Sequence, residues 1–168
     1  MGSEMCIRDS INPMDMLEDY GLTEDDDSST TPMEIKKEKA IRKKTEYIMS
    51  IVERMISVNG SADSSTITPQ QRTLIDKCVQ ETYKEYLKHD FDPSYMPTLL
   101  DLQEVLNSKK SESEDAEKVA EGIEYYTTGS MNVFSHHTNI NINNRFVVFN
   151  VRDLGEQLKQ AVSYTHLT

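Results

Sequence analysis

Two stretches of this chain combine residue types that could do chemistry. The first is the adjacent pair His136 and His137, which suggests a metal site or acid–base catalysis. Neighbouring residues of an extended chain point to opposite sides, and no cysteine or pair of acids stands at ligand spacing from the two histidines. The sequence therefore predicts no metal site at this pair.

The second stretch surrounds an apolar, β-favouring run at residues 146–149 (FVVF). A run of this kind is typical of a strand buried on both faces, as in a parallel sheet that is covered by helices. Ligands of open α/β sheets gather at the carboxyl ends of the strands, so the polar residues at that end of the run, together with Arg145 just before it, form the candidate site. They are Arg145, Asn150, Arg152 and Asp153.

Two interpretations of this candidate site stay open. In the first, Arg145 or Arg152 contributes to a subunit contact or to a contact near a nucleotide. In the second, Arg145 closes a turn and Asp153 caps a helix that begins near Leu154. Other catalytic patterns, such as a GxSxG nucleophile elbow or a cysteine–histidine signature, do not occur in the sequence.

ATP hydrolysis by a P-loop protein needs two motifs that this sequence lacks. A Walker A loop brings backbone amides to the phosphates through glycines and then supplies lysine, but no glycine here is followed by lysine. A Walker B strand ends in an acid, whereas Asn150 follows the run at residues 146–149. The chain alone is therefore predicted not to hydrolyse ATP.

Upstream of the candidate site, the sequence predicts four helices. The first two begin with a capping threonine followed by proline, at residues 31–32 and 68–69. A third is expected over about residues 98–107, and a fourth follows the acidic stretch at residues 111–115 and ends near Gly129. Apolar residues recur at three- and four-residue steps in each helix, which predicts one buried face per helix. The expected buried residues are Ile41, Ile48, Ile51, Val52, Met55, Leu74, Ile75, Cys78, Val79, Tyr83, Leu87, Leu99, Leu102, Val105, Leu106, Val119, Ala120, Ile123 and Tyr126.

The net charge is −11 at pH 7, and acid is concentrated at residues 24–27 and 112–117, as is typical of solvated loops. An acidic surface repels phosphate backbones, so direct binding of this segment to nucleic acid is not expected. One basic cluster opposes the acid and is interpreted as a solvated helix face. Its members are Lys36, Lys37, Lys39, Arg42, Lys43 and Lys44.

The two cysteines form neither a disulfide framework nor a metal-binding spacing, and Cys78 is expected in the core. No apolar run approaches the ~20 residues of a membrane-spanning helix, and no secretory signal is visible. These observations favour a cytoplasmic setting.

Both ends of the chain differ from the pattern beside them. Residues 1–10 (MGSEMCIRDS) and 162–168 (VSYTHLT) resemble peptides that arise when sequencing-adapter DNA is translated at the ends of assembled metagenomic reads. We therefore interpret residues 11–161 as the native part, and the chain as an internal fragment of a longer protein. A single buried strand at residues 146–149 agrees with this interpretation, because its sheet partners would lie outside the chain.

Four strings resemble, in order, the energising ATPases of conjugative and type IV secretion systems, which are VirB-type P-loop proteins of the FtsK–HerA-like superfamily. The strings are INPMD at residues 11–15, LIDKCV at 74–79, YTTGSMNVFSHHTNI at 126–140 and NNRFVVFNVRDLGEQLK at 143–159. The resemblance implies an α/β fold that is part of a RecA-like P-loop core. One buried strand plus a helix would occupy residues 130–161, a mostly helical insertion residues 32–129, and an extended segment with an acidic loop residues 11–31.

The resemblance also implies an activity for the intact parent protein. Its Walker A motif would lie upstream of Ile11 and its Walker B motif downstream of Ala161. The parent would bind ATP and magnesium, assemble as a hexamer, associate with the membrane through other components of the secretion channel, and drive transfer of DNA or protein. Two alternatives stay open: a non-enzymatic helical interaction module with acidic loops, and a fragment of another P-loop DNA translocase.

Overall fold

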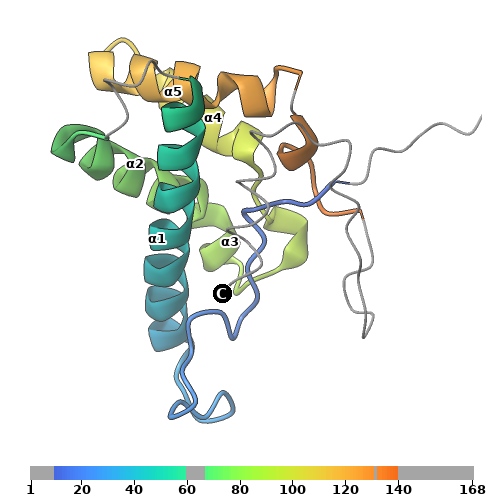
Figure 1. Cartoon of the computed structure of the whole chain (residues 1–168). Helices are drawn as coiled ribbons and strands as arrows, with labels where there is room; N and C mark the ends of the chain where they lie inside the picture. Colours follow the sequence, from blue (N-terminus) through green and yellow to red (C-terminus); the bar gives the residue numbers. More distant parts are fainter. Residues whose placement is uncertain (1–9, 60–66, 131, 140–168) are drawn as a thin grey trace, which may run out of the picture.

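The computed structural model describes residues 10–59, 67–130 and 132–139. Figure 1 shows that α1 is the long helix of this part, that α2 lies across its middle and that α5 lies across its upper end. In chain order the described elements are α1 (Met33–Asn59), α2 (Pro69–Thr82), α3 (Lys84–Lys88), the 3-10 helix η1 (Pro93–Tyr95), α4 (Leu99–Ser108), α5 (Glu114–Thr127) and the 3-10 helix η2 (Asn132–Phe134).

The predicted α/β fold is wrong, because the structure is helical and its described residues contain no strand. The physical reason is that the helices cover one another's apolar faces. Helices α1, α2, α4 and α5 pack against each other and share a single cluster of buried side chains, so this core closes without a sheet. The run at residues 146–149 and the helix expected after it, on which the α/β prediction depended, lie outside the described residues.

The four predicted helical regions are confirmed, except that the second, which was expected to continue to Leu87, is divided at Tyr83 into α2 and α3. The helix ends show how local sequence determines them. The second begins with a capping box, in which the Thr68 hydroxyl accepts from the Gln71 amide at 3.2 Å and the Gln71 side chain accepts from the Thr68 amide at 3.0 Å. The first helix begins at Met33, one residue later than predicted. The Thr31 hydroxyl donates to the Asp27 carbonyl at 2.8 Å.

The predicted buried faces are confirmed for most of their members. Ile48, Val52, Ile75, Leu102 and Ile123 have almost no exposed surface. The exceptions pack against the edge of the core and are only partly buried; they are Ile41, Leu74, Leu87 and Val105. Burial of this kind contributes roughly 1.5–3 kcal/mol for each large aliphatic side chain, so these faces supply the main stabilisation of the fold.

A glycine sets the close approach of α5 to α1. A Cβ atom added at Gly122 would lie 2.6 Å from Cγ1 of Ile56, which is closer than real Cβ atoms come. Glycine at this position lets the two helices pack more tightly than any other residue would allow.

Two further sequence predictions are confirmed in the core. Cys78 is fully buried, and burial raises the pKa of its thiol to about 11. Tyr126 is buried whereas Tyr125 is 37% exposed, and the two rings meet edge to face with centroids 5.3 Å apart.

None of the helices in the described part is both long and apolar enough to cross a membrane.

Candidate functional site

A turn shapes the leading segment, defined here as residues 10–16, which contains the string INPMD. The Asn12 carbonyl accepts from the Asp15 amide at 3.1 Å, and the Asn12 side chain accepts from the Met14 amide at 3.0 Å. Asparagine followed by Pro13 favours this geometry, because the amide side chain bonds the backbone two residues on and proline presets its φ angle. The turn directs the side chains of Met14 and Met16 into the core, where both are fully buried.

Side chains from the helices hold the carbonyl groups of the leading segment. The buried hydroxyls of Tyr83 and Tyr86 donate to the carbonyls of Met14 and Met16, respectively. The ammonium group of Lys44 in α1 donates to the Asp15 carbonyl at 2.6 Å. Three successive carbonyls, which would otherwise be buried without partners, are thereby satisfied.

The return segment, defined here as residues 132–139, binds the leading segment. The Ser10 amide donates to the Asn139 side chain at 2.7 Å, and the Asn139 amide donates to the Ser10 carbonyl at 3.2 Å. The Asn12 amide donates to the Thr138 hydroxyl at 2.9 Å, although 126 residues separate the two. The chain therefore leaves for the helices and comes back from them at one place, to the right of α1 in Figure 1.

Asp15 connects the two segments to each other. One oxygen of its carboxylate accepts from the Asn12 amide group at 2.9 Å, and the other accepts from the Thr138 hydroxyl at 2.5 Å. The same Asn12 amide group donates to the carbonyl of Pro97, just before α4, at 2.8 Å. We call the contacts of Asn12, Asp15 and Thr138 the junction.

Lys44 is the buried charge beside the junction. Its side chain is enclosed, and its ammonium nitrogen lies 4.9 Å from the ring centre of Tyr20 and 4.7 Å from that of Tyr47. Both rings attract the charge through their π faces. Burial nevertheless lowers the pKa of Lys44 to about 8, and the negative charge of Asp15 opposes this shift only in part.

We expect the free energy of unfolding to rise by about 1 kcal/mol between about pH 8 and pH 9. The pKa of Lys44 is about 8 in the folded protein against 10.5 as its ordinary value, so in this window the unfolded chain keeps a proton that the folded chain releases. Above about pH 9 the Cys78 thiol acts in the opposite direction, because its pKa is raised by folding. Urea denaturation of the wild type across this window measures the rise.

The control for this pH dependence is a pair of neighbouring lysines. Lys44→Met should abolish the rise, because it removes the buried titrating group. Lys43→Met should preserve it, since Lys43 is exposed. An equal rise in both variants would mean that another group titrates.

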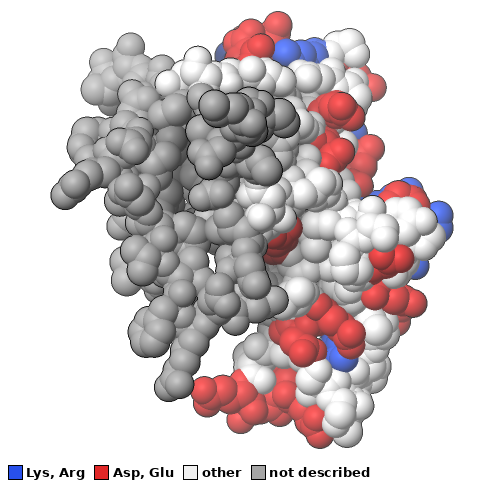
Figure 2. All heavy atoms as spheres, turned by 90° about the vertical axis from the view of Figure 1, so that its right-hand side faces the viewer, with Lys and Arg blue, Asp and Glu red and all other residues white. Residues whose placement is uncertain are grey.

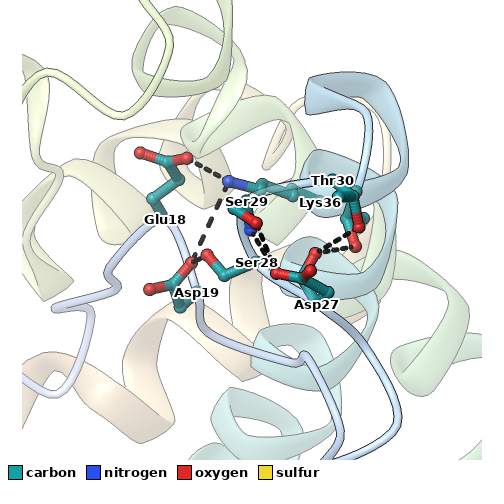
Figure 3. A network of polar contacts seen from close by, with 8 residues as sticks. Glu18, Asp19, Asp27, Ser28, Ser29, Thr30 and Lys36 are labelled. Atoms are coloured by element: carbon teal, nitrogen blue, oxygen red, sulfur yellow. Dashed lines mark hydrogen bonds and ion pairs between the residues drawn. The ribbon is translucent and has the colours of Figure 1, made fainter.

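Only part of the basic cluster at the start of α1 is the solvated face that the sequence predicted, because of its six members only Arg42 and Lys43 are exposed. Lys36 and Lys44 are buried, and Figure 3 shows the Lys36 ammonium group directed toward the carboxylates of Glu18 and Asp19. The reason is that the acidic loop, residues 17–31, folds back over the first turns of α1. Much of the basic charge is thus neutralised within the chain.

Two more ion pairs join α1 to neighbouring segments, one to the acidic loop and one to the turn after α3. Lys39 lies 2.5 Å from Asp26, and hydrogen bonds from Lys39 and from Thr23 lower the pKa of Asp26 to about 2. Lys37 lies 2.7 Å from Asp90, whose backbone φ of 51° marks the tight turn after α3. Figure 2 shows acidic side chains over much of the described surface on one face, with few basic ones between them. A surface of this charge repels a phosphate backbone.

The candidate site residues from the sequence, Arg145, Asn150, Arg152 and Asp153, all lie outside the described residues. His136 and His137 are described, and both are exposed. In the parts of the chain that the structure describes, no group of three or more histidine, cysteine or acidic side chains is placed to hold a metal ion.

His89 is the residue that directly follows α3. Its ring also stacks on Tyr95 at 3.9 Å between centroids, a contact that the sequence did not predict.

A shallow groove of about 380 Å³ lies between α1 and α2. The buried hydroxyl of Thr45 faces it and has no hydrogen-bond partner among the described residues. Three carboxylates and one guanidinium group are a mixed set that selects no single reactant, so the groove defines no reaction. Its lining residues are Glu38, Ile41, Arg42, Thr45, Glu46, Asp76 and Gln80.

Sequence reasoning missed the residues of the junction and the role of Lys44. A local signal existed for Asn12, because asparagine before proline favours a turn. A second signal existed at Tyr83 and Tyr86, since a tyrosine on a buried helix face needs an acceptor for its hydroxyl. No local pattern indicates that Thr138 pairs with a segment 126 residues away.

Comparisons of this chain with protein-family models, with curated proteins and with solved structures found no significant match. The described part is a helical unit whose leading and return segments are hydrogen-bonded to each other beside a buried lysine.

Proposed function

We propose that the chain is part of a conjugation-type transfer ATPase, in which the described helices form a non-catalytic unit inserted between two segments of the parent protein. The parent would couple ATP hydrolysis to the transfer of DNA or protein through a type IV secretion channel. It would work as a hexamer in the cytoplasm and meet the membrane through other components of the channel.

One observation carries this proposal. Two of the four strings that resemble this family, at residues 11–15 and 126–140, are far apart in the sequence, yet their described residues are hydrogen-bonded at the junction. An insertion must leave and rejoin its host at neighbouring points, and the hydrogen bonds between Ser10 and Asn139 support the proposal, since they bring the two ends of the helical unit together. Helices that close their own core satisfy the second requirement of an insertion, which is that it folds without distorting its host.

In this proposal the chemistry belongs to residues outside the chain. ATP and magnesium would be held by a Walker A loop upstream of Ile11 and by an acidic residue downstream of Ala161, and water would attack the γ-phosphate. The candidate residues Arg145, Asn150, Arg152 and Asp153 would contribute at most a subunit contact or a contact near the nucleotide. The helical unit would position neighbouring parts of the parent.

The test is to recover the longer reading frame that overlaps residues 11–161. The protein that this frame encodes and the present chain are then both expressed. We expect the sequence GxxxxGK[ST] upstream of INPMD, and steady-state ATP hydrolysis by the longer protein only. Replacing the lysine of that loop with alanine is the matched control and should abolish hydrolysis. A longer frame without the phosphate-binding loop, or ATP hydrolysis by the present chain, would refute the proposal.

The second candidate is a helical interaction module without catalysis. The self-contained core favours it, because the described helices bury their apolar faces without needing another domain. The same experiment separates the two candidates. A native gene that codes for little more than the helical unit supports the module, whereas a gene with the phosphate-binding loop supports the ATPase.

A further inference from the structure

The leading segment is attached to the helices in an unusual way. Among the described residues, no backbone–backbone hydrogen bond joins residues 11–16 to a helix. The attachment depends on polar tips of three side chains, those of Tyr83, Tyr86 and Lys44, and on the buried Met14 and Met16. One more hydrogen bond contributes, from the Asn12 side chain to the Pro97 carbonyl before α4. A segment held in this way can leave without breaking any helix.

The buried ammonium group of Lys44 opposes this attachment. Moving a charge out of water is costly unless a counter-ion compensates for it. In the described part of the chain no carboxylate lies within ion-pair distance of Lys44. Both carboxylate oxygens of Asp15, the acid whose charge acts on Lys44, already accept hydrogen bonds from Asn12 and Thr138.

The other titratable groups around Lys44 do not compensate for its burial. The acidic loop contributes Tyr20, α1 itself contributes Lys43 and Tyr47, and the helices behind the leading segment contribute Tyr83 and Tyr86. The four tyrosines are neutral near pH 7, and Lys43 has the same charge as Lys44. The lowered pKa of Lys44 agrees with a net cost of keeping the charge in this place.

We propose that the leading segment is a releasable strap, which leaves the helical core together with the return segment and whose release is favoured by the buried ammonium group of Lys44. On release, Lys44 regains its hydration, and the carbonyls of residues 14–16 exchange their side-chain partners for water. The two segments leave as one because the Asn12–Thr138 and Asp15–Thr138 hydrogen bonds join them. This strap does not depend on the proposed ATPase function, because all the residues that it requires belong to this chain.

Release of the leading and return segments would separate the helical unit from any part of a longer protein that continues these two segments. The helices would keep their own core, since most of its buried side chains come from α1, α2, α4 and α5. Release would expose the two methionines, the tyrosine hydroxyls, and Phe134 and Ser135 of the return segment, without unfolding the helices. Local opening of this kind is common in segments that have few backbone hydrogen bonds to the core.

Hydrogen exchange of the full chain, measured by mass spectrometry and expressed as protection factors, tests the strap. In the wild type we expect the amides of Asn12, Met14 and Asp15, which are the residues with an amide proton in the range 12–15, to exchange through an opening that is independent of low urea concentrations. The amides of α4 and α5 should exchange only through an opening that urea promotes. If residues 12–15 exchange with the same urea dependence as α5, the strap does not open by itself and the proposal is overturned.

The role of Lys44 is tested with two matched variants. Lys44→Met retains most of the apolar stem and removes the charge, and it also removes the donor to the Asp15 carbonyl. Because we expect the gain from removing the buried charge to exceed the loss of this hydrogen bond, the protection of the leading segment should rise about tenfold, the equivalent of one pKa unit. Lys43→Met changes the exposed neighbour and should leave the protection unchanged. Lower or unchanged protection in Lys44→Met would show that the ammonium group does not favour release.

A third variant tests whether the two segments move together. Thr138→Val removes both the hydroxyl that accepts from Asn12 and the donor to Asp15, with little change of volume. Residues 136–139 should then exchange faster than residues 12–15, whereas in the wild type the two segments should share one opening rate. Different rates in the wild type would refute the joint release.

Discussion

Ile123→Ala is expected to lower the free energy of unfolding by about 2–5 kcal/mol. Ile123 is completely buried in α5, in the cluster that α5 shares with α1, α2 and α4. Truncation to alanine removes three buried carbon atoms and leaves a cavity, because the surrounding helices relax only in part. A loss of this size is a large fraction of the stability of a small domain.

Urea denaturation followed by far-ultraviolet circular dichroism measures this loss. Glu121→Ala is the matched control, since Glu121 is exposed on the same helix, and its effect should stay within about 0.5 kcal/mol. If Ile123→Ala were as mild as the control, α5 would not be part of a closed helical core. The helices would then lack the shared core that defines the helical fold.

Gly21→Ala is expected to destabilise the protein by about 2 kcal/mol or more, because it combines two unfavourable effects. The backbone of Gly21 has a φ of +91°, a conformation that residues with a Cβ atom rarely adopt. The added Cβ would also lie 2.7 Å from the carbonyl oxygen of Lys39. That oxygen belongs to the backbone of α1, so it cannot move aside without distorting the helix.

Thermal and urea unfolding of Gly21→Ala report the effect, and Gly122→Ala provides the comparison. At Gly122 the clash is with the Ile56 side chain, which can change its position, and alanine in a helix gains about 1 kcal/mol over glycine. The net effect at Gly122 should therefore be the smaller of the two. A neutral Gly21→Ala would indicate that the acidic loop does not pack against α1 as described.

The loop that Gly21 allows also explains why the basic cluster was misinterpreted. Six basic residues within nine positions indicate a solvated surface, because a lysine is rarely buried. The burial of Lys36 depends on Glu18 and Asp19, which approach only when residues 17–31 fold back. This contact belongs to the tertiary structure, and it cannot be predicted from the residues next to Lys36 in the sequence.

The fold class was misjudged for a related reason. The α/β prediction depended on one apolar run at residues 146–149 and on a family resemblance, whereas the helices already had complete apolar faces. Four such faces can close a core among themselves, and in the described residues they do. The periodicity of a sequence indicates which face of a helix is buried but not what covers that face.

The sequence by itself determined the helical regions, the capped start of α2 and most of the buried residues, including Cys78 and Tyr126. These features depend on contacts between residues three or four positions apart, which a single window of sequence contains. Only the tertiary structure decided the burial of Lys44 and the pairing of Asn12 with Thr138. Both join segments that are distant in the chain, and the free energy of such contacts depends on how the whole unit packs.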